Sequence, residues 1–159
     1  MSVEKVKEYL KKFGVDDRVM EFAQSSATVE LAAEAVGCEP ARIAKTLSLD
    51  VNGKVILVVT AGDVKVDNPK YKSQFGVKAR MLTPDEAVSR IGFAVGGICP
   101  FAVDEEASVY LDDSLKRFET VFPSGGSNNS AIELTIPELE KYSNCTAWID
   151  VTKAREARE

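Results

Sequence analysis

The sequence contains no histidine at all, and this absence removes several kinds of chemistry. Without histidine there is no Ser-His or Cys-His pair for nucleophilic catalysis, and no zinc site of the common histidine-containing kinds. Cysteine is scarce as well, because Cys38, Cys99 and Cys145 form no close pair and leave one thiol over in any pairing. This usage favours reduced thiols in a cytosol over a disulfide framework or a structural zinc. We therefore expect a protein without a metal and without a cofactor.

Long apolar runs and an excess of positive charge are also missing. No apolar run reaches the roughly 20 residues needed to span a bilayer, and the N-terminus has the pattern of a charged helix. We therefore expect a cytoplasmic protein with no membrane partner. The net charge of −5 argues against a general nucleic-acid binder, so no DNA partner is expected. It leaves open an enzyme that holds only the end of an RNA.

The 159 residues suffice for one ordinary domain with a sizeable core. Asn52-Gly53 between two β-rich runs predicts a hairpin of strands at about 46–50 and 54–60. Further strands are expected near 19–22, 108–112, 119–122, 131–134 and 146–151. Helices are expected at about 2–13, 28–37, 68–76 and 83–91, with a short one starting near 135. This succession indicates an α+β domain with a mixed, strongly curved sheet.

The ends of these elements carry further expectations. Thr28 is expected to cap its helix, and Asn68 is expected to be the N-cap before Pro69. We expect a single domain over 1–152, followed by a charged tail at 153–159 that is a frayed helix or disordered.

Paired glycines and one lysine are the candidate functional residues. Gly96-Gly97 stands three residues before Pro100, and such a loop offers backbone N–H and C=O groups to a small ligand. A tight turn between strands also uses these residue types. Lys45 is expected near the start of a core strand, and Gly125-Gly126 opens another strand.

These segments in this order resemble the YbaK-type aminoacyl-tRNA deacylases, which are free-standing relatives of the editing domain inserted in bacterial prolyl-tRNA synthetases. The specific matches are Lys45-Thr46-Leu47 and the Gly-x-x-x-Pro pattern of 96–100. Supporting matches lie at 28–37, 113–115, 124–126 and 132–134, so the resemblance covers nearly the whole chain. It implies a mixed barrel-like sheet of six or seven strands flanked by helices, with a pocket at one barrel mouth.

The resemblance also implies the reaction. The substrate would be a tRNA carrying the wrong amino acid, and the ester to its 3′-terminal ribose would be hydrolysed by water. Because such an ester is already activated, the enzyme needs only to bind the terminal adenosine, place a water and stabilise the oxyanion. The implied partner is the acceptor end of a mischarged tRNA, and an aminoacyl-tRNA synthetase is a further candidate partner.

Two other functions stay open. One is a module that binds aminoacyl-tRNA ends or synthetases without turnover, and the other is a hydrolase of a non-tRNA acyl ester. The amino acid is open among alanine, serine, cysteine and threonine. Some family members that clear cysteine from proline tRNA carry an aspartate just before the Ile132-Glu133-Leu134 segment, where this chain has Ala131. Cysteine specificity is therefore not carried over.

Lys45 and Gly96 are the candidate catalytic residues. The resemblance makes the lysine essential, as a cation that grips the substrate's carbonyl or terminal phosphate, or as a base if desolvation lowers its pKa. The Gly96 carbonyl would orient water or substrate, and Gly97 would supply an N–H. Only Lys45 could activate the Cys99 thiol, so pocket lining or packing is favoured there over covalent catalysis. The expected substrate-binding residues are Thr28, Thr46, Gly97, Ile98, Cys99, Pro100, Gly126, Ser127 and Asn128.

A basic stretch gives a candidate tRNA contact. Between 65 and 80 the sequence has five cations against the single acid Asp67. They form either a solvated face or a phosphate-contacting rim beside the pocket. The candidate rim residues are Lys65, Lys70, Lys72, Lys78 and Arg80.

Overall fold

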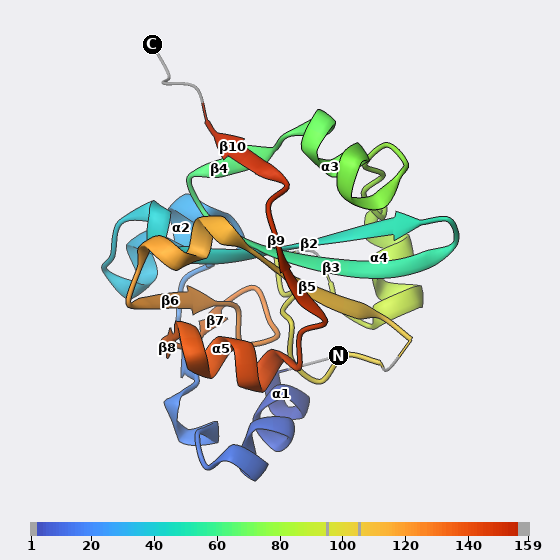
Figure 1. The fold of residues 1–159 in the computed structure, drawn as a ribbon. Coiled ribbons are helices and arrows are strands. Elements are labelled where there is room, and N and C mark those ends of the chain that lie inside the picture. Colours follow the sequence, from blue (N-terminus) through green and yellow to red (C-terminus); the bar gives the residue numbers. More distant parts are fainter. Residues whose placement is uncertain (1–2, 95, 105, 156–159) are drawn as a thin grey trace.

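The computed structural model of the protein describes residues 3–94, 96–104 and 106–155 (Figure 1). Within these residues the main sheet has six strands in the order β8-β6-β2-β3-β5-β9. In that order they are Leu134–Thr135, Thr120–Pro123, Ile43–Val51, Lys54–Ala61, Ser108–Asp112 and Ala147–Ile149.

The sheet is mixed, and it curls into a half-barrel. Its central pair, β2 and β3, is antiparallel, whereas β6 runs parallel to β2 and β5 runs parallel to β3. At the two edges, β9 is parallel to β5 and β8 is antiparallel to β6. This arrangement confirms the predicted α+β class with a mixed, strongly curved sheet flanked by helices.

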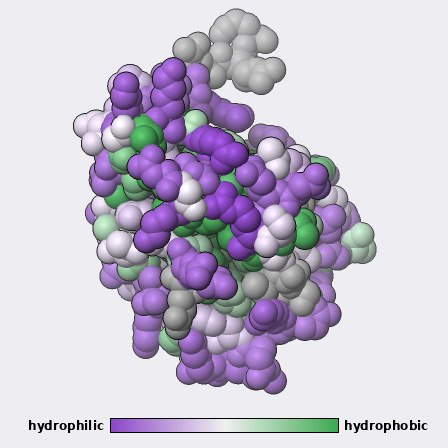
Figure 2. Space-filling view, turned by 90° about the vertical axis from the view of Figure 1, so that its right-hand side faces the viewer, coloured by the Kyte–Doolittle hydropathy of each residue, from purple (hydrophilic) through white to green (hydrophobic). Residues whose placement is uncertain are grey.

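Strand β3 shows why both faces of the sheet are covered. Val55, Leu57 and Val59 pack into the larger apolar cluster, whereas Ile56 and Val58 pack into a second one. Because successive side chains of a strand point to opposite faces, such an apolar run must be buried on both sides. On one side lie α1 (Val3–Leu10) and α5 (Ile136–Ser143), and on the other lies α3 (Asn68–Phe75) (Figure 1). The outer surface on the right-hand side of Figure 1 is largely hydrophilic (Figure 2).

The helix ends follow capping chemistry, with one correction. Helix α2 (Val29–Val36) begins after Thr28, whose Oγ1 accepts a hydrogen bond from the Leu31 N–H at 3.1 Å, as predicted. Helix α4 (Pro84–Ile91) begins with a capping box. The predicted N-cap of α3 was wrong, because Asp67 rather than Asn68 accepts the Lys70 N–H, at 3.0 Å. Either residue type can cap a helix, and here the extended backbone is that of Asp67.

Several strand boundaries differ from the prediction. Strand β2 begins three residues earlier than expected, so Lys45 lies inside it. The segment expected as one strand at 131–134 is two: β7 (Ser130–Ala131), which pairs with β1 (Met20–Glu21), and β8. Ser2, the predicted start of the first helix, lies outside the described residues.

The C-terminal end contains a strand that the sequence did not predict. Strand β10 (Thr152–Ala154) forms an antiparallel ribbon with β4 (Val64–Val66), which was not predicted either. The expectation of a frayed helix or disorder is therefore wrong for Lys153 and Ala154, while 156–159 lie outside the described residues. Among the helices that the structure describes, none combines the length and the apolar character needed to cross a bilayer.

The buried carboxylate of Asp112 ties this C-terminal segment to the sheet, and its removal should be costly. It accepts hydrogen bonds from the Ser114 N–H (2.9 Å), the Val151 N–H (2.9 Å) and the Thr152 hydroxyl (2.7 Å). Asp112→Ala leaves these donors without their acceptor, so we expect the free energy of unfolding to fall by about 2–4 kcal/mol. Urea denaturation measures this change.

The matched control is the adjacent Asp113, which is exposed and pairs with Lys116 at 3.2 Å. Asp113→Ala should change the free energy of unfolding by less than about 0.5 kcal/mol, because exposed ion pairs contribute little. Equal effects of the two substitutions would contradict a structural role for the Asp112 carboxylate.

Candidate functional site

A cavity of about 280 Å³ opens where β2 begins, between α2 and loops from distant parts of the chain. Its walls are mostly apolar, and the polar groups among the described lining residues are hydroxyls and one ammonium, with no carboxylate. The lining residues are Ser26, Ala27, Thr28, Val29, Ala32, Ile43, Ala44, Lys45, Thr46, Gly96, Ile98, Phe122, Ser124, Ser130 and Ala131. An apolar enclosure with a few polar groups is typical of a small-molecule site.

Three chain segments form one wall of this cavity: 22–28, 96–98 and 124–130. The first and third are joined by hydrogen bonds from the Phe22 N–H to the Asn129 carbonyl (2.7 Å) and from the Ser26 N–H to the Asn128 carbonyl (2.6 Å). The second packs against the third so closely that a Cβ on Gly97 would lie 3.0 Å from the Gly126 carbonyl oxygen. The paired glycines therefore allow the loops to meet.

Gly96 is the glycine that faces the cavity. Its φ of +88° is in the left-handed region, which glycine adopts without strain. A Cβ at this position would lie 2.9 Å from the Cβ of Ala27 and 3.3 Å from the Cβ of Asn128. Both the backbone conformation and the space thus require glycine here.

Lys45 projects from β2 and supplies the cation of the cavity. It is half-buried, and its Nζ donates a hydrogen bond to the Val64 carbonyl at 2.6 Å. An ammonium has three N–H groups, so this bond leaves others that can reach a ligand. Burial is the main cause that lowers the pKa of Lys45, and the charge of Arg155 lowers it further, while Asp63 acts in the opposite direction.

Two hydroxyls at this site have no protein partner. Ser26 Oγ and Thr46 Oγ1 are buried, and within the described part of the chain neither forms a hydrogen bond. A buried polar atom without a partner costs about 1–3 kcal/mol, and a bound polar ligand would remove that cost. Thr46 was expected at the site, whereas Ser26 was not.

The structure brings together only part of the expected substrate-binding set. Thr28, Thr46 and Ile98 line the cavity together with Lys45 and Gly96. The remaining expected residues do not line it: Gly97, Cys99, Pro100, Gly126, Ser127 and Asn128.

The residues outside the cavity have other contacts. The Gly97 N–H, expected to be offered to substrate, donates to the Ala94 carbonyl at 3.0 Å. Cys99 is fully buried in the main apolar cluster, and burial raises the pKa of its thiol to about 12. It is therefore a neutral packing residue. Pro100 lines a separate hollow that also contains Tyr9, and Ser127 donates its N–H to the Ser130 hydroxyl at 3.2 Å.

Several lining residues were missed by the sequence reasoning. Ser124 and Ser130 flank the second paired glycine, so the serine-rich composition of that loop was an available signal. Ala131 is buried in the cavity wall. No local pattern marks Ser26 and Ala27, whose place at the site depends on the bonds between loops.

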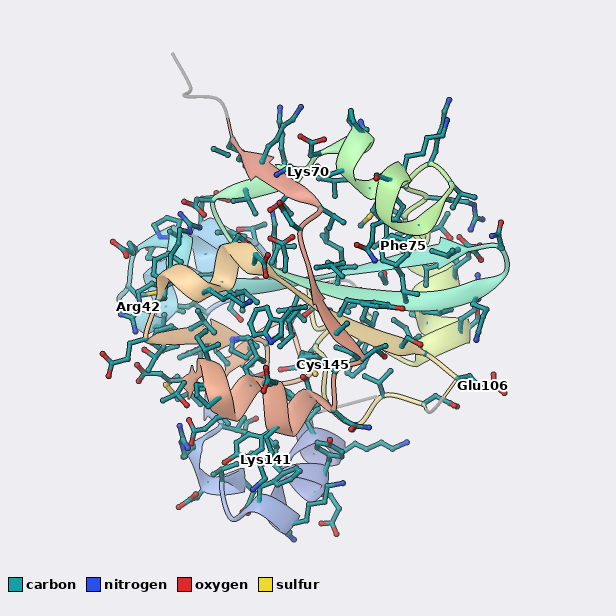
Figure 3. The ribbon with its side chains drawn as sticks, in the orientation of Figure 1. Arg42, Lys70, Phe75, Glu106, Lys141 and Cys145 are labelled. Atoms are coloured by element: carbon teal, nitrogen blue, oxygen red, sulfur yellow. The ribbon has the colours of Figure 1, made fainter. Side chains whose placement is uncertain are left out.

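The five candidate rim cations do not surround the cavity. Lys70 pairs with Asp150 at 3.0 Å and lies beside β10 (Figure 3). Arg80 pairs with Glu86 at 3.0 Å and with Asp50 near the end of β2 opposite to Lys45. Lys72 and Lys78 are exposed, in α3 and just after it. Of the five, Lys65 alone adjoins the site, because it follows Val64, the partner of Lys45.

The curled, mixed sheet with its flanking helices matches the fold of tRNA-editing domains. The model of the aminoacyl-tRNA editing domain matches residues 23–142, so the chain belongs to this family. The expected resemblance is thereby confirmed.

Relatives and solved structures agree with this assignment. The uncharacterised protein YwhH of Bacillus subtilis (strain 168) is 51% identical over 154 residues, which cover 96% of this chain and 98% of the relative. A candidate Cys-tRNA(Pro)/Cys-tRNA(Cys) deacylase, EbsC of Enterococcus faecalis, is 29% identical over 129 residues, which cover 78% of each chain. A crystal structure of a candidate trans-editing enzyme for prolyl-tRNA synthetase superposes with a TM-score of 0.85 at 27% identity, covering 96% of this chain and 97% of the other.

Proposed function

We propose that this protein hydrolyses the ester bond of mischarged aminoacyl-tRNA in trans, with water as the nucleophile. The observation that carries the proposal is the half-buried ammonium of Lys45 in an apolar cavity that also contains two unpartnered hydroxyls. Membership in the aminoacyl-tRNA editing family supports the substrate class. Since aminoacyl-tRNA is made and used in the cytoplasm, that is where the protein would act.

In the proposed reaction the chain positions the ester and stabilises charge. A water oxygen attacks the carbonyl carbon, and the negative charge that develops on the carbonyl oxygen is stabilised by the N–H groups of Lys45 that Val64 does not occupy. The bond from that carbon to the ribose oxygen then breaks. The ribose oxygen takes up the proton that the attacking water gives up, which leaves tRNA and a free amino acid. The backbone of Gly96 holds water or substrate at the cavity wall.

The largely apolar cavity, which holds the ammonium of Lys45, favours a small amino acid without a basic side chain. Among the described lining residues no carboxylate is available to pair with a basic side chain. Discrimination by size alone is weak, because one methylene changes binding by only about 1–3 kcal/mol. Alanine, serine, cysteine and threonine therefore all remain candidates, and the two free hydroxyls at Ser26 and Thr46 would favour a substrate with polar groups there.

A deacylation panel tests the proposal. Proline tRNA charged separately with alanine, serine, cysteine, threonine or proline is incubated with the purified protein, and loss of the aminoacyl ester is followed against a protein-free control. We expect rapid hydrolysis of at least one mischarged species and little effect on the proline ester. Binding of these tRNAs without any turnover would replace the proposal with a recognition module. Hydrolysis of simple acyl esters without any tRNA turnover would instead favour a generic esterase.

A further inference from the structure

The ribbon of β4 and β10 places two lysines directly opposite each other. Lys65 and Lys153 are register partners in this antiparallel pair. Like charges in directly opposite positions destabilise a strand pair. Within the described residues neither lysine forms an ion pair that would offset this repulsion. The fold thus tolerates a local electrostatic cost at this position.

A third cation belongs to the same face. Side chains alternate along a strand, so Arg155, two residues after Lys153, follows it on the outer side of the ribbon, while Val64 and Thr152 are buried beneath. Arg155 is exposed and, like the two lysines, has no ion pair among the described residues. We call Lys65, Lys153 and Arg155 the ribbon cations.

This ribbon borders the cavity. The Val64 carbonyl that accepts from Lys45 Nζ at 2.6 Å belongs to β4, and the Arg155 N–H donates to the Asp63 carbonyl at 3.2 Å. The charge of Arg155 is also felt at Lys45, whose pKa it lowers. The nearby carboxylate of Asp63 already accepts hydrogen bonds from the two terminal guanidinium nitrogens of Arg117, at 3.0 and 2.5 Å. It is therefore engaged elsewhere and does not pair with the ribbon cations.

We propose that the ribbon cations bind backbone phosphates of the RNA acceptor end whose terminal ester lies in the cavity. The proposal rests on the proposed function, and it replaces the rim expected along 65–80. A protein with a net charge of −5 needs a local concentration of positive charge to hold RNA. The ribbon cations, which have no ion-pair partner among the described residues, supply it beside the reacting ester. Phosphate contacts of this kind fix orientation rather than read sequence.

The test compares two double variants with the same loss of charge. Lys65→Gln/Lys153→Gln removes the opposed lysines, and Lys72→Gln/Lys78→Gln removes two exposed lysines that have no ion pair in the described structure. The dissociation constant for uncharged proline tRNA is measured between low and physiological salt for each variant and the wild type. Hydrolysis is measured on the best mischarged tRNA and on the corresponding aminoacyl-adenosine, which has no acceptor-stem phosphates.

The ribbon variant should bind tRNA about tenfold more weakly at low salt, and its log–log salt slope should fall by roughly 0.7–0.9 per lost contact. The control variant should keep the wild-type slope. The ribbon variant should hydrolyse aminoacyl-adenosine at the wild-type rate. Because its substitutions remove a repulsion between two lysines, its melting temperature should be at or above that of the wild type.

Other outcomes overturn the proposal. Equal loss of tRNA binding in both variants would indicate that tRNA is attracted by surface charge in general and not bound at the ribbon cations. If the ribbon variant also hydrolyses aminoacyl-adenosine more slowly, the substitutions have damaged the cavity. If its tRNA binding is unchanged, the ribbon cations bind another partner, such as an acidic protein surface. If wild-type protein hydrolyses none of the mischarged tRNAs, the proposed function fails, while the binding measurements still decide the role of the ribbon cations.

Discussion

Lys45→Ala should lower the deacylation rate by about 10²–10³, which is the typical loss when one preorganised oxyanion-stabilising contact is removed. The side chain is half-buried at the cavity, and its ammonium is held in place by the Val64 carbonyl. Lys45→Arg should fail as well, because a planar guanidinium does not replace a compact ammonium in a confined space. Single-turnover deacylation of the best mischarged tRNA measures both effects.

The control for this experiment is Lys54→Ala. Lys54 belongs to β3, the neighbouring strand, but it is exposed at the hairpin end and does not line the cavity. The Lys54→Ala variant should keep the wild-type deacylation rate. Lys45→Ala, Lys45→Arg and Lys54→Ala should all melt near the wild-type temperature. Near wild-type turnover by Lys45→Ala would remove Lys45 from the mechanism.

Gly96→Ala should reduce activity much more than it reduces stability. The added methyl would lie 2.9 Å from the Cβ of Ala27, so the loops must separate and the cavity wall must shift. A displacement of about 1 Å at such a wall can cost about 10² in rate. The left-handed backbone adds about 1–2 kcal/mol of strain. Melting and deacylation are measured on one preparation.

Gly14→Ala is the matched control, because Gly14 also has a left-handed φ, +72°, but a Cβ there would meet no atom within 4 Å. It shares the backbone strain and lacks the steric contact. Gly14→Ala therefore measures the part of the stability loss that comes from backbone strain, and Gly96→Ala should melt at or somewhat below that temperature. Only Gly96→Ala should lose activity. If Gly96→Ala melts early yet keeps its specific activity, the glycine serves the turn alone.

The central part of the fold could be predicted because its signals are local. The Asn52-Gly53 turn and the apolar run of β3 predicted the hairpin, and the Thr28 cap predicted the start of α2. Lys45 and Gly96 could be chosen because each belongs to a short pattern. Gly97 was misjudged because neighbouring residues of a tight loop present their groups in different directions, and its N–H closes the turn.

Features that depend on distant partners could not be predicted. Strand β10 pairs with β4 across most of the sequence, and no local pattern marks either strand. Ser26 reaches the cavity only through bonds between loops that lie about a hundred residues apart in the chain. The basic stretch does not form one rim for the same reason. Lys65 and Arg80 are near in sequence, but Lys65 lies in the β4–β10 ribbon, whereas Arg80 pairs with Glu86 of α4.

The joined loops of the cavity also determine when the site can exist during synthesis. The β2–β3 hairpin is local, and short-range pairs of this kind form within microseconds. The wall formed by residues 22–28, in contrast, is completed only when 124–130 supply the Asn128 and Asn129 carbonyls. A nascent chain that has emerged only as far as β5 therefore has three of the six strands of its main sheet but no closed cavity. The catalytic site should therefore form in one late step, when residues 124–130 dock against residues 22–28.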